Sequence, residues 1–331
     1  MSRRRRRKTA ARAPQVPLKV AAFAGGGLLL MLALILLVAR SGDSAGAFAR
    51  AEAYAEAGDM ASARVEAMNA VQAEPDNEAA WLLLARSQLA LGDGPGAAGT
   101  VARARAAGVT AGRTRHLFAE AALLQGDTAL ALSETAADDI APEFLGDAAR
   151  MRARALHTQG DTQRAAAVFD VAIEIDPESS GLWLDIARFR MDTGALGGAI
   201  EAADRSVELD ATNVEALVLK GRLVRSQYGL VASLPWFERA LEVNPDYMPA
   251  LFEQAKTLGE VGRYTEMLAA TRAVLKREPG NADALYLQAV LAARAQFPAG
   301  AKDRRTGRWP ARSDGGNAVA SGGDRLSGTQ L

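Results

Sequence analysis

The hydrophobic and polar positions of this chain fall into two different patterns. Residues 18–39 are almost continuously apolar, and Lys19 is their only charge. From residue 44 onward, apolar groups separated by polar residues recur with a fixed period, and glycine returns at a constant interval of 34 residues. The interval fails once, at Tyr228, where the glycine stands one place later as Gly229. The glycines that keep the interval are Gly58, Gly92, Gly126, Gly160, Gly194 and Gly262.

The period predicts a series of helical hairpins. Each unit should contain a helix of about 14 residues, a glycine turn, a second helix and a turn marked by proline. Units that begin at residues 44, 78, 112, 146, 180, 214, 248 and 282 need no insertion to align. A small residue then stands eighth in every unit and lets the two helices approach closely: Ala51, Ala85, Ala119, Ala153, Ala187, Gly221, Ala255 and Ala289. We expect Trp183, Phe169 and Phe237 to fill the space between neighbouring hairpins.

The residues at the turns explain where the helices should end. Glycine after the first helix supplies a left-handed C-terminal cap. Aspartate follows four of these glycines, as Asp59, Asp93, Asp127 and Asp161, and can cap the second helix. Pro177 and Pro245 stop the second helix of their units because the residue before proline disfavours the helical conformation.

This arrangement resembles the tetratricopeptide repeat family, whose 34-residue units carry small, aromatic and proline residues at set places. The clearest match is residues 214–247, and residues 146–179 come close; the third unit is the weakest. In residues 214–247 the matching residues are Gly221, Phe237, Ala240 and Pro245. In residues 146–179 they are Ala153, Phe169, Ala172 and Pro177. The third unit departs from the pattern at Asp138 and Pro142. The resemblance covers residues 44–295, about seven and a half units, and implies an all-α solenoid with a concave groove.

In this family the first helix of each hairpin lines the groove, and the ninth residue of each unit should point into it. Those places hold Glu52, Arg86, Glu120, Arg154, Arg188, Arg222 and Lys256, with Arg150 and Arg225 on the same helices. We therefore predict a partner-binding groove made by Arg86, Arg154, Arg188, Arg222, Lys256, Arg150 and Arg225. Arginine pairs with carboxylates through two parallel hydrogen bonds, so an acidic segment or a C-terminal carboxylate is the expected ligand. The alternative is that these arginines pair with acids of neighbouring turns, such as Asp185 and Glu215, or are merely solvated.

The apolar segment 18–39 is long enough to cross a bilayer as one helix. Residues 1–17 form a basic N-terminus, and this bias places it in the cytoplasm and the repeats outside it. We therefore expect a single-pass protein of the inner (cytoplasmic) membrane with periplasmic or extracytoplasmic repeats. A cleaved signal peptide is the alternative.

The C-terminal residues depart from the repeat. The eighth unit begins in register, but Pro298 and Pro310 with the arginines near them prevent an apolar stripe, so residues 296–331 are expected to be disordered. Half a hairpin would expose the apolar face of its helix, including Tyr286 and Leu287 or their neighbours. A truncated or frame-shifted end and a natural tail both remain open.

The composition of the chain limits which partners and which kinds of catalytic or metal site it can have. The chain has 331 residues and no net charge, but its first 19 residues are basic and the body between residues 20 and 295 is acidic, which argues against nucleic acid as a partner. There is no cysteine, and His116 and His157 are the only histidines. No catalytic constellation, phosphate loop or metal-ligand spacing is present, so we expect no enzyme, no cofactor and no metal.

These observations favour a membrane-anchored, non-enzymatic scaffold that binds a protein partner in its groove. Assembly, secretion or maturation in a bacterial cell envelope is the expected setting. The alternatives are an accessory repeat subunit of an envelope enzyme complex and a self-assembling repeat protein, that is, a homo-oligomer.

Overall fold

The structure is a computed structural model that describes residues 46–296, and the described part is all helical apart from turns. Residues 46–56 are helical and precede the first complete element. The elements are α2 (Met60–Ala73), α3 (Glu78–Ala90), α4 (Gly94–Ala106), η1 (Ala111–Arg113), α5 (Arg115–Leu124), α6 (Thr128–Thr135), η2 (Pro142–Phe144), α7 (Leu145–Thr158), α8 (Thr162–Ile175), α9 (Ser180–Asp192), α10 (Leu196–Leu209), α11 (Val214–Tyr228), α12 (Leu230–Val243), α13 (Met248–Val261), α14 (Tyr264–Arg277) and α15 (Ala282–Gln296).

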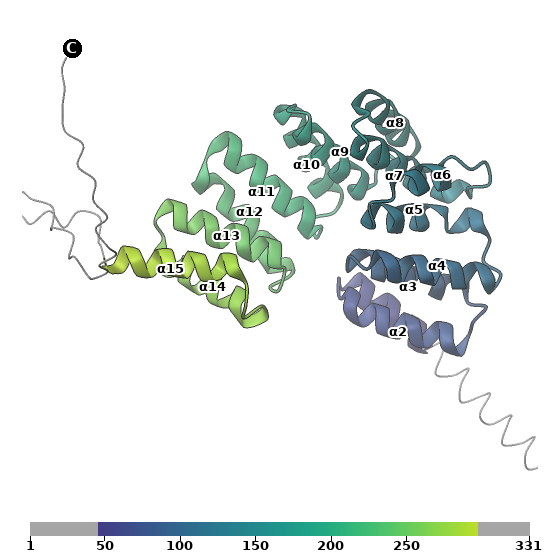
Figure 1. The fold of residues 1–331 in the computed structure, drawn as a ribbon, viewed down its shortest axis with the longest axis horizontal. Coiled ribbons are helices and arrows are strands. Elements are labelled where there is room, and N and C mark those ends of the chain that lie inside the picture. Colours follow the sequence, from purple (N-terminus) through teal and green to yellow (C-terminus); the bar gives the residue numbers. More distant parts are fainter. Residues whose placement is uncertain (1–45, 297–331) are drawn as a thin grey trace, which may run out of the picture.

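The helices form a chain of antiparallel hairpins. Consecutive helices pack as pairs, from α3 with α4 to α13 with α14, and α15 is the first helix of an eighth unit. Five units begin at the residue that the 34-residue period predicts: Glu78, Ser180, Val214, Met248 and Ala282. The hairpins follow one another along an open arch (Figure 1).

The turn chemistry predicted from the sequence is confirmed. All six glycines of the 34-residue series have positive φ angles, as does Gly229. In the turn after α3, the backbone N–H of Asp93 donates to the carbonyl of Gln88 at 2.9 Å, the long hydrogen bond of a Schellman cap. The Asp93 carboxylate then accepts from the N–H of Gly96 and caps α4. Asp59, Asp127 and Asp161 cap the second helices of their units in the same way.

First helices line the inner side of the arch. Those of successive units pack directly against each other, as α7 does on α9, α9 on α11 and α11 on α13. The second helices α8, α10 and α12 make no comparable contact with one another. Closer spacing of the first helices bends the array toward them, so their free faces form the concave surface.

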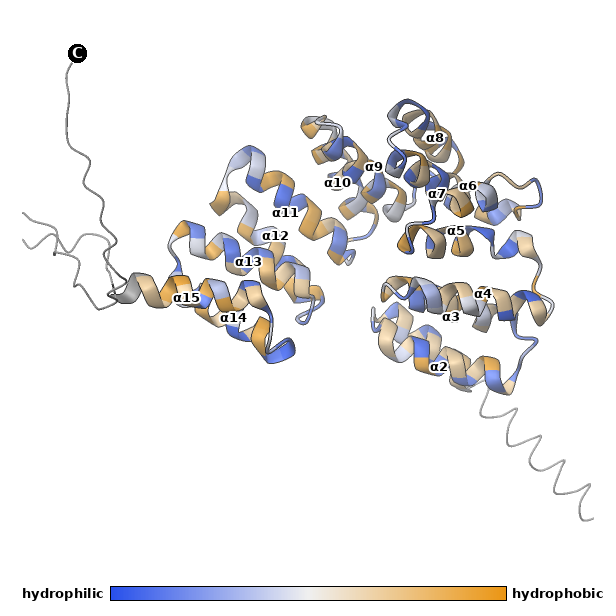
Figure 2. Cartoon of the chain, viewed as in Figure 1, coloured by the Kyte–Doolittle hydropathy of each residue, from blue (hydrophilic) through white to orange (hydrophobic). Residues whose placement is uncertain are grey.

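Small residues and a few aromatic rings make the core. Ala153, Ala187 and Ala199 have no exposed surface, and Phe237 is also completely buried. Gly221 is needed for this packing, since a Cβ atom there would overlap the Phe237 ring. Trp183 is only partly buried and packs at the edge of the same cluster. Apolar residues mix with polar ones along each helix (Figure 2), as helices that bury one face require.

The third unit is irregular, as its sequence predicts. Its second helix, α6, has only 8 residues and ends at Thr135. The loop that follows contains Asp138 and leads to η2 at Pro142. Arg115 of α5 forms ion pairs with Glu134 and Asp139 and holds this loop against the solenoid.

The membrane location predicted from the sequence is corrected by the structure. Within residues 46–296 no helix has both the length and the apolar character to cross a bilayer. The longest elements bounded above, α11 and α15, have 15 residues each, about 22 Å of helix against a hydrocarbon core of about 30 Å. The span proposed at residues 18–39, the basic residues 1–17 and the tail from residue 297 lie outside the described residues.

Candidate protein-binding groove

The seven predicted groove residues all lie on first helices. Arg86 is on α3, Arg150 and Arg154 are on α7, Arg188 is on α9, Arg222 and Arg225 are on α11, and Lys256 is on α13. The arginines on α7, α9 and α11 fall into two clusters, each built around a buried carboxylate. Arg86 lies apart from them and places its guanidinium 5.9 Å from the centre of the Phe144 ring.

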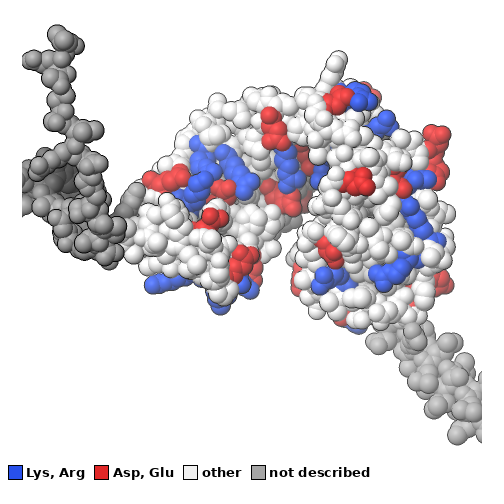
Figure 3. Space-filling model, viewed as in Figure 1, with Lys and Arg blue, Asp and Glu red and all other residues white. Residues whose placement is uncertain are grey.

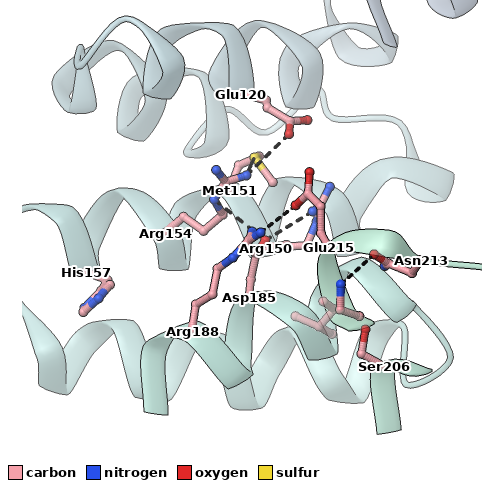
Figure 4. A network of polar contacts seen from close by, with 12 residues as sticks. Glu120, Arg150, Met151, Arg154, His157, Asp185, Arg188, Ser206, Asn213 and Glu215 are labelled. Atoms are coloured by element: carbon pink, nitrogen blue, oxygen red, sulfur yellow. Dashed lines mark hydrogen bonds and ion pairs between the residues drawn. The ribbon is translucent and has the colours of Figure 1, made fainter. Parts of the chain in front are cut away.

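The first cluster surrounds Asp185 of α9 (Figure 4). The Asp185 side chain is 4% exposed and accepts hydrogen bonds at 3.2 Å from both Arg150 and Arg188. Arg154 lies 3.7 Å from the same carboxylate. One buried anion of α9 therefore fixes three guanidinium groups from two consecutive repeats.

Further acids complete this cluster. Arg150 also contacts Asp147 at 3.3 Å, Arg154 contacts Glu120 at 3.4 Å, and Arg188 donates to Glu215 at 2.5 Å. The four carboxylates outnumber the three arginines. The ion pairs with Asp185 and Glu215 that the sequence offered as the alternative to ligand binding are thus present.

The second cluster surrounds Glu253 of α13. The Glu253 side chain is 9% exposed and accepts from Arg222 at 2.7 Å and from Arg225 at 2.8 Å. Arg225 also donates to the hydroxyl of Thr257 at 3.2 Å. Here two arginines face one carboxylate, so this cluster carries a net positive charge.

Burial and neighbouring carboxylates act in opposite directions on these arginines. Burial alone would lower the pKa of Arg150, but Asp185, Glu120 and Asp147 hold it above its usual range. The pKa of Arg188 is raised for the same reason, against its burial, by Asp185 and Glu215. Both side chains remain cations.

The arginines of the two clusters differ in how much of each side chain is exposed, and this decides which of them a partner can reach. The side chains of Arg150 and Arg225 are 18% and 20% exposed, whereas those of Arg188 and Arg222 are 39% and 45% exposed. Lys256 is exposed and makes no ion pair among residues 46–293, whose side chains the structure describes. Basic and acidic side chains lie close together over the middle of the arch (Figure 3).

A pocket lies at the C-terminal end of the described helices, and Lys256 of the predicted groove is among its lining residues. The pocket has a volume of about 390 Å³ and lies between α13, the start of α14 and α15. Its walls also include Phe252, Tyr264, Tyr286, Leu287 and Leu291. The sequence predicted exposure for both Tyr286 and Leu287. Tyr286 is 68% exposed, but Leu287 packs partly buried against Leu258 and Met267, because this face of α15 lies on the preceding hairpin.

The two histidines have structural surroundings. His116 is buried, stacks on Phe144 with ring centres 4.2 Å apart, and has no hydrogen-bond partner on either nitrogen. His157 contacts Asp192 at 3.1 Å and lies edge-on to Phe189. Within residues 46–296, no three His, Asp or Glu side chains are grouped so that they could hold a metal ion.

Sequence reasoning missed the organising role of Asp185 and Glu253. Both stand sixth in their 34-residue units, where most other units have an apolar residue: Leu83, Leu117, Met151, Leu219 and Leu287. A carboxylate at this usually apolar place was the available signal. It indicates that the arginines are held by buried anions inside the array.

Comparisons with known proteins agree with the repeat architecture. Residues 156–223 and residues 252–301 match family models described as tetratricopeptide repeat. The chain therefore contains tetratricopeptide repeats. A chain in the crystal structure of the APC/C hetero-tetramer Cut9-Hcn1 is similar in fold, with a TM-score of 0.52 and 12% sequence identity. The match covers 69% of this chain and 47% of the other, so it spans about half the length of that protein. At this sequence identity the similarity shows the fold alone. No curated protein matches the chain.

Proposed function

We propose that this protein is a non-enzymatic scaffold whose concave face binds an extended segment of a protein partner. The observation that carries the proposal is a pair of arginines, Arg188 and Arg222, whose side chains are 39% and 45% exposed and are held on the inner helices by buried carboxylates. A rigid array of paired helices with such groups at its inner surface is suited to binding and offers no catalytic group beside them.

The partner segment is proposed to carry a carboxylate that binds near Arg222. Only the Nε atom of Arg222 donates a hydrogen bond, which leaves its two terminal amino groups without a hydrogen-bond partner among the described residues. Lys256 follows Glu253 by one turn on α13 and is also unpaired within that part of the chain. At Arg188 the partner would displace Glu215, whose side chain is 49% exposed, and exchange of an exposed ion pair costs little.

Replacing both exposed arginines should abolish partner binding. In an Arg188→Gln/Arg222→Gln variant Asp185 keeps Arg150 and Arg154, and Glu253 keeps Arg225, so no buried carboxylate is left unpaired. The measurement is affinity capture with the full chain from its source cells, followed by mass spectrometry. We expect proteins captured by the wild type to be absent from the variant.

The matched control is Arg205→Gln on α10, a second helix. Arg205 is 44% exposed and pairs with Glu208 at 3.4 Å, so it resembles the groove arginines in exposure and pairing but lies on the other helix of its hairpin. The control should capture the wild-type set. Capture of one identical set by all three proteins, with equal thermal melting, would exclude an arginine-dependent groove.

Self-association is the second candidate function, and the surface of α15 favours it. Leu285 and Tyr286 are 47% and 68% exposed on this first helix of the eighth unit. If this face joins two copies, sedimentation of the full chain should show a dimer that Tyr286→Ser abolishes. Tyr228→Ser, at a tyrosine of α11 that is 67% exposed, should leave the dimer unchanged. A monomer throughout the micromolar range would count against self-association.

A further inference from the structure

The pocket at the C-terminal end of the described helices combines aromatic rings with unpaired acids. Phe252 of α13, Tyr264 of α14 and Tyr286 of α15 supply three rings to its lining. Glu260 and Asp283 supply two carboxylates, both exposed. The remaining wall is largely aliphatic, with Leu287, Val290 and Leu291 of α15.

The charges of this pocket are not compensated internally. Among residues 46–293, whose side chains the structure describes, Glu260, Asp283 and Lys256 make no ion pair. Two carboxylates against one ammonium leave the pocket with one net negative charge. This distinguishes it from the Asp185 and Glu253 clusters, whose buried acids are all paired.

We propose that this pocket binds the side chain of a lysine or arginine of the partner segment. The inference rests on the proposed function, since it places that residue in the same groove. The aliphatic stem of the basic residue would lie along Leu287, Val290 and Leu291, and its cation would reach the ring faces and the carboxylates of Glu260 and Asp283.

Other side chains fit the pocket less well. An acidic side chain meets two carboxylates and only one lysine. An aliphatic side chain would contact only the apolar wall. A lysine or arginine would contact that wall and also pair with the carboxylates of Glu260 and Asp283. Lys256 lies one turn from Glu253 of the second arginine cluster, so one extended segment can bring a carboxylate to Arg222 and Lys256 and a cation to the pocket.

The test uses peptides selected on the immobilised full chain from a random dodecapeptide library. We expect the selected peptides to share a lysine or arginine. Replacing that residue with norleucine, which keeps a hydrocarbon stem and removes the cation, should weaken binding to the wild type at least about tenfold. On a Glu260→Gln/Asp283→Asn variant the same replacement should change affinity less than about twofold.

The control variant is Glu201→Gln/Glu208→Gln, which removes two exposed acids from α10 and should retain the full norleucine effect. Equal binding of the norleucine peptide, or an equal loss on the pocket variant, would overturn the cation pocket. Selection of peptides without a basic residue would do the same. If such peptides still require Arg188 and Arg222, the groove function stands and only the pocket assignment fails. If the wild type selects no groove-dependent peptide, both proposals fail.

Discussion

Replacing Asp185 with leucine is expected to destabilise the central repeats by about 3–5 kcal/mol, because it removes the anion that three arginines share. Leucine is the residue at the same place in four other units, as Leu83, Leu117, Leu219 and Leu287. The substitution therefore restores the apolar pattern of the repeat and leaves no cavity of note. Its cost arises from charge, since Arg150 is only 18% exposed and Arg188 loses its hydrogen bond at 3.2 Å.

The measurement is urea unfolding combined with hydrogen exchange of α7 and α9, since repeat arrays need not unfold in one step. Asp185→Asn, which keeps the shape and removes the charge, should also be destabilised. Asp192→Asn is the matched control on the same helix. Its side chain is 52% exposed and pairs with His157 at 3.1 Å, so we expect a change within about 0.5 kcal/mol. Equal stability of the Asp185 and Asp192 variants would show that the buried carboxylate is not what holds the cluster.

Features that depend on neighbouring residues in the sequence were predictable. The Gly160–Asp161 turn is an example, because the positive φ of Gly160 and the cap from Asp161 to Arg164 are set by local backbone sterics and hydrogen bonding. The repeat then places the first helices of five units at their predicted residues. The same local rules account for the positive φ of all six glycines in the series and for the four aspartate caps.

Features that depend on contacts between repeats were harder to predict from the sequence. The arginines were placed on the inner helices from their position in the unit. Which of them remain exposed depends on how α7, α9 and α11 are rotated and spaced, and this decides that Arg150 is enclosed while Arg222 is 45% exposed. Leu287 shows the same limit, because its burial depends on how α15 packs on α13 and α14.

Acid is expected to destabilise the third unit through His116. This histidine is 4% exposed and has no hydrogen-bond partner on its ring. Burial is the main reason that its pKa falls from 6.5 to about 4; Arg86 and Arg150 lower it further, and Asp147 opposes them. The folded protein therefore resists protonation that the unfolded chain accepts freely.

The sign of the effect follows from this lowered pKa. Well above pH 6.5 the histidine is neutral in both states, and its titration does not affect stability. As the pH falls from 6.5 toward 4, only the unfolded chain gains the proton, so stability is lost progressively, by about 3 kcal/mol at pH 4. Below the folded-state pKa the loss levels off, because both states then bind the proton.

A His116→Leu variant isolates this contribution. Leucine stands at the same place in the unit as Leu82 and Leu184, and it cannot titrate. The free energy of unfolding, measured in urea from about pH 8 to about pH 4, should fall more steeply for the wild type than for the variant, with a difference that grows to about 3 kcal/mol. Carboxylates shared by both proteins cancel in this difference. Parallel curves for wild type and His116→Leu would mean that protonated His116 is accommodated in the folded protein.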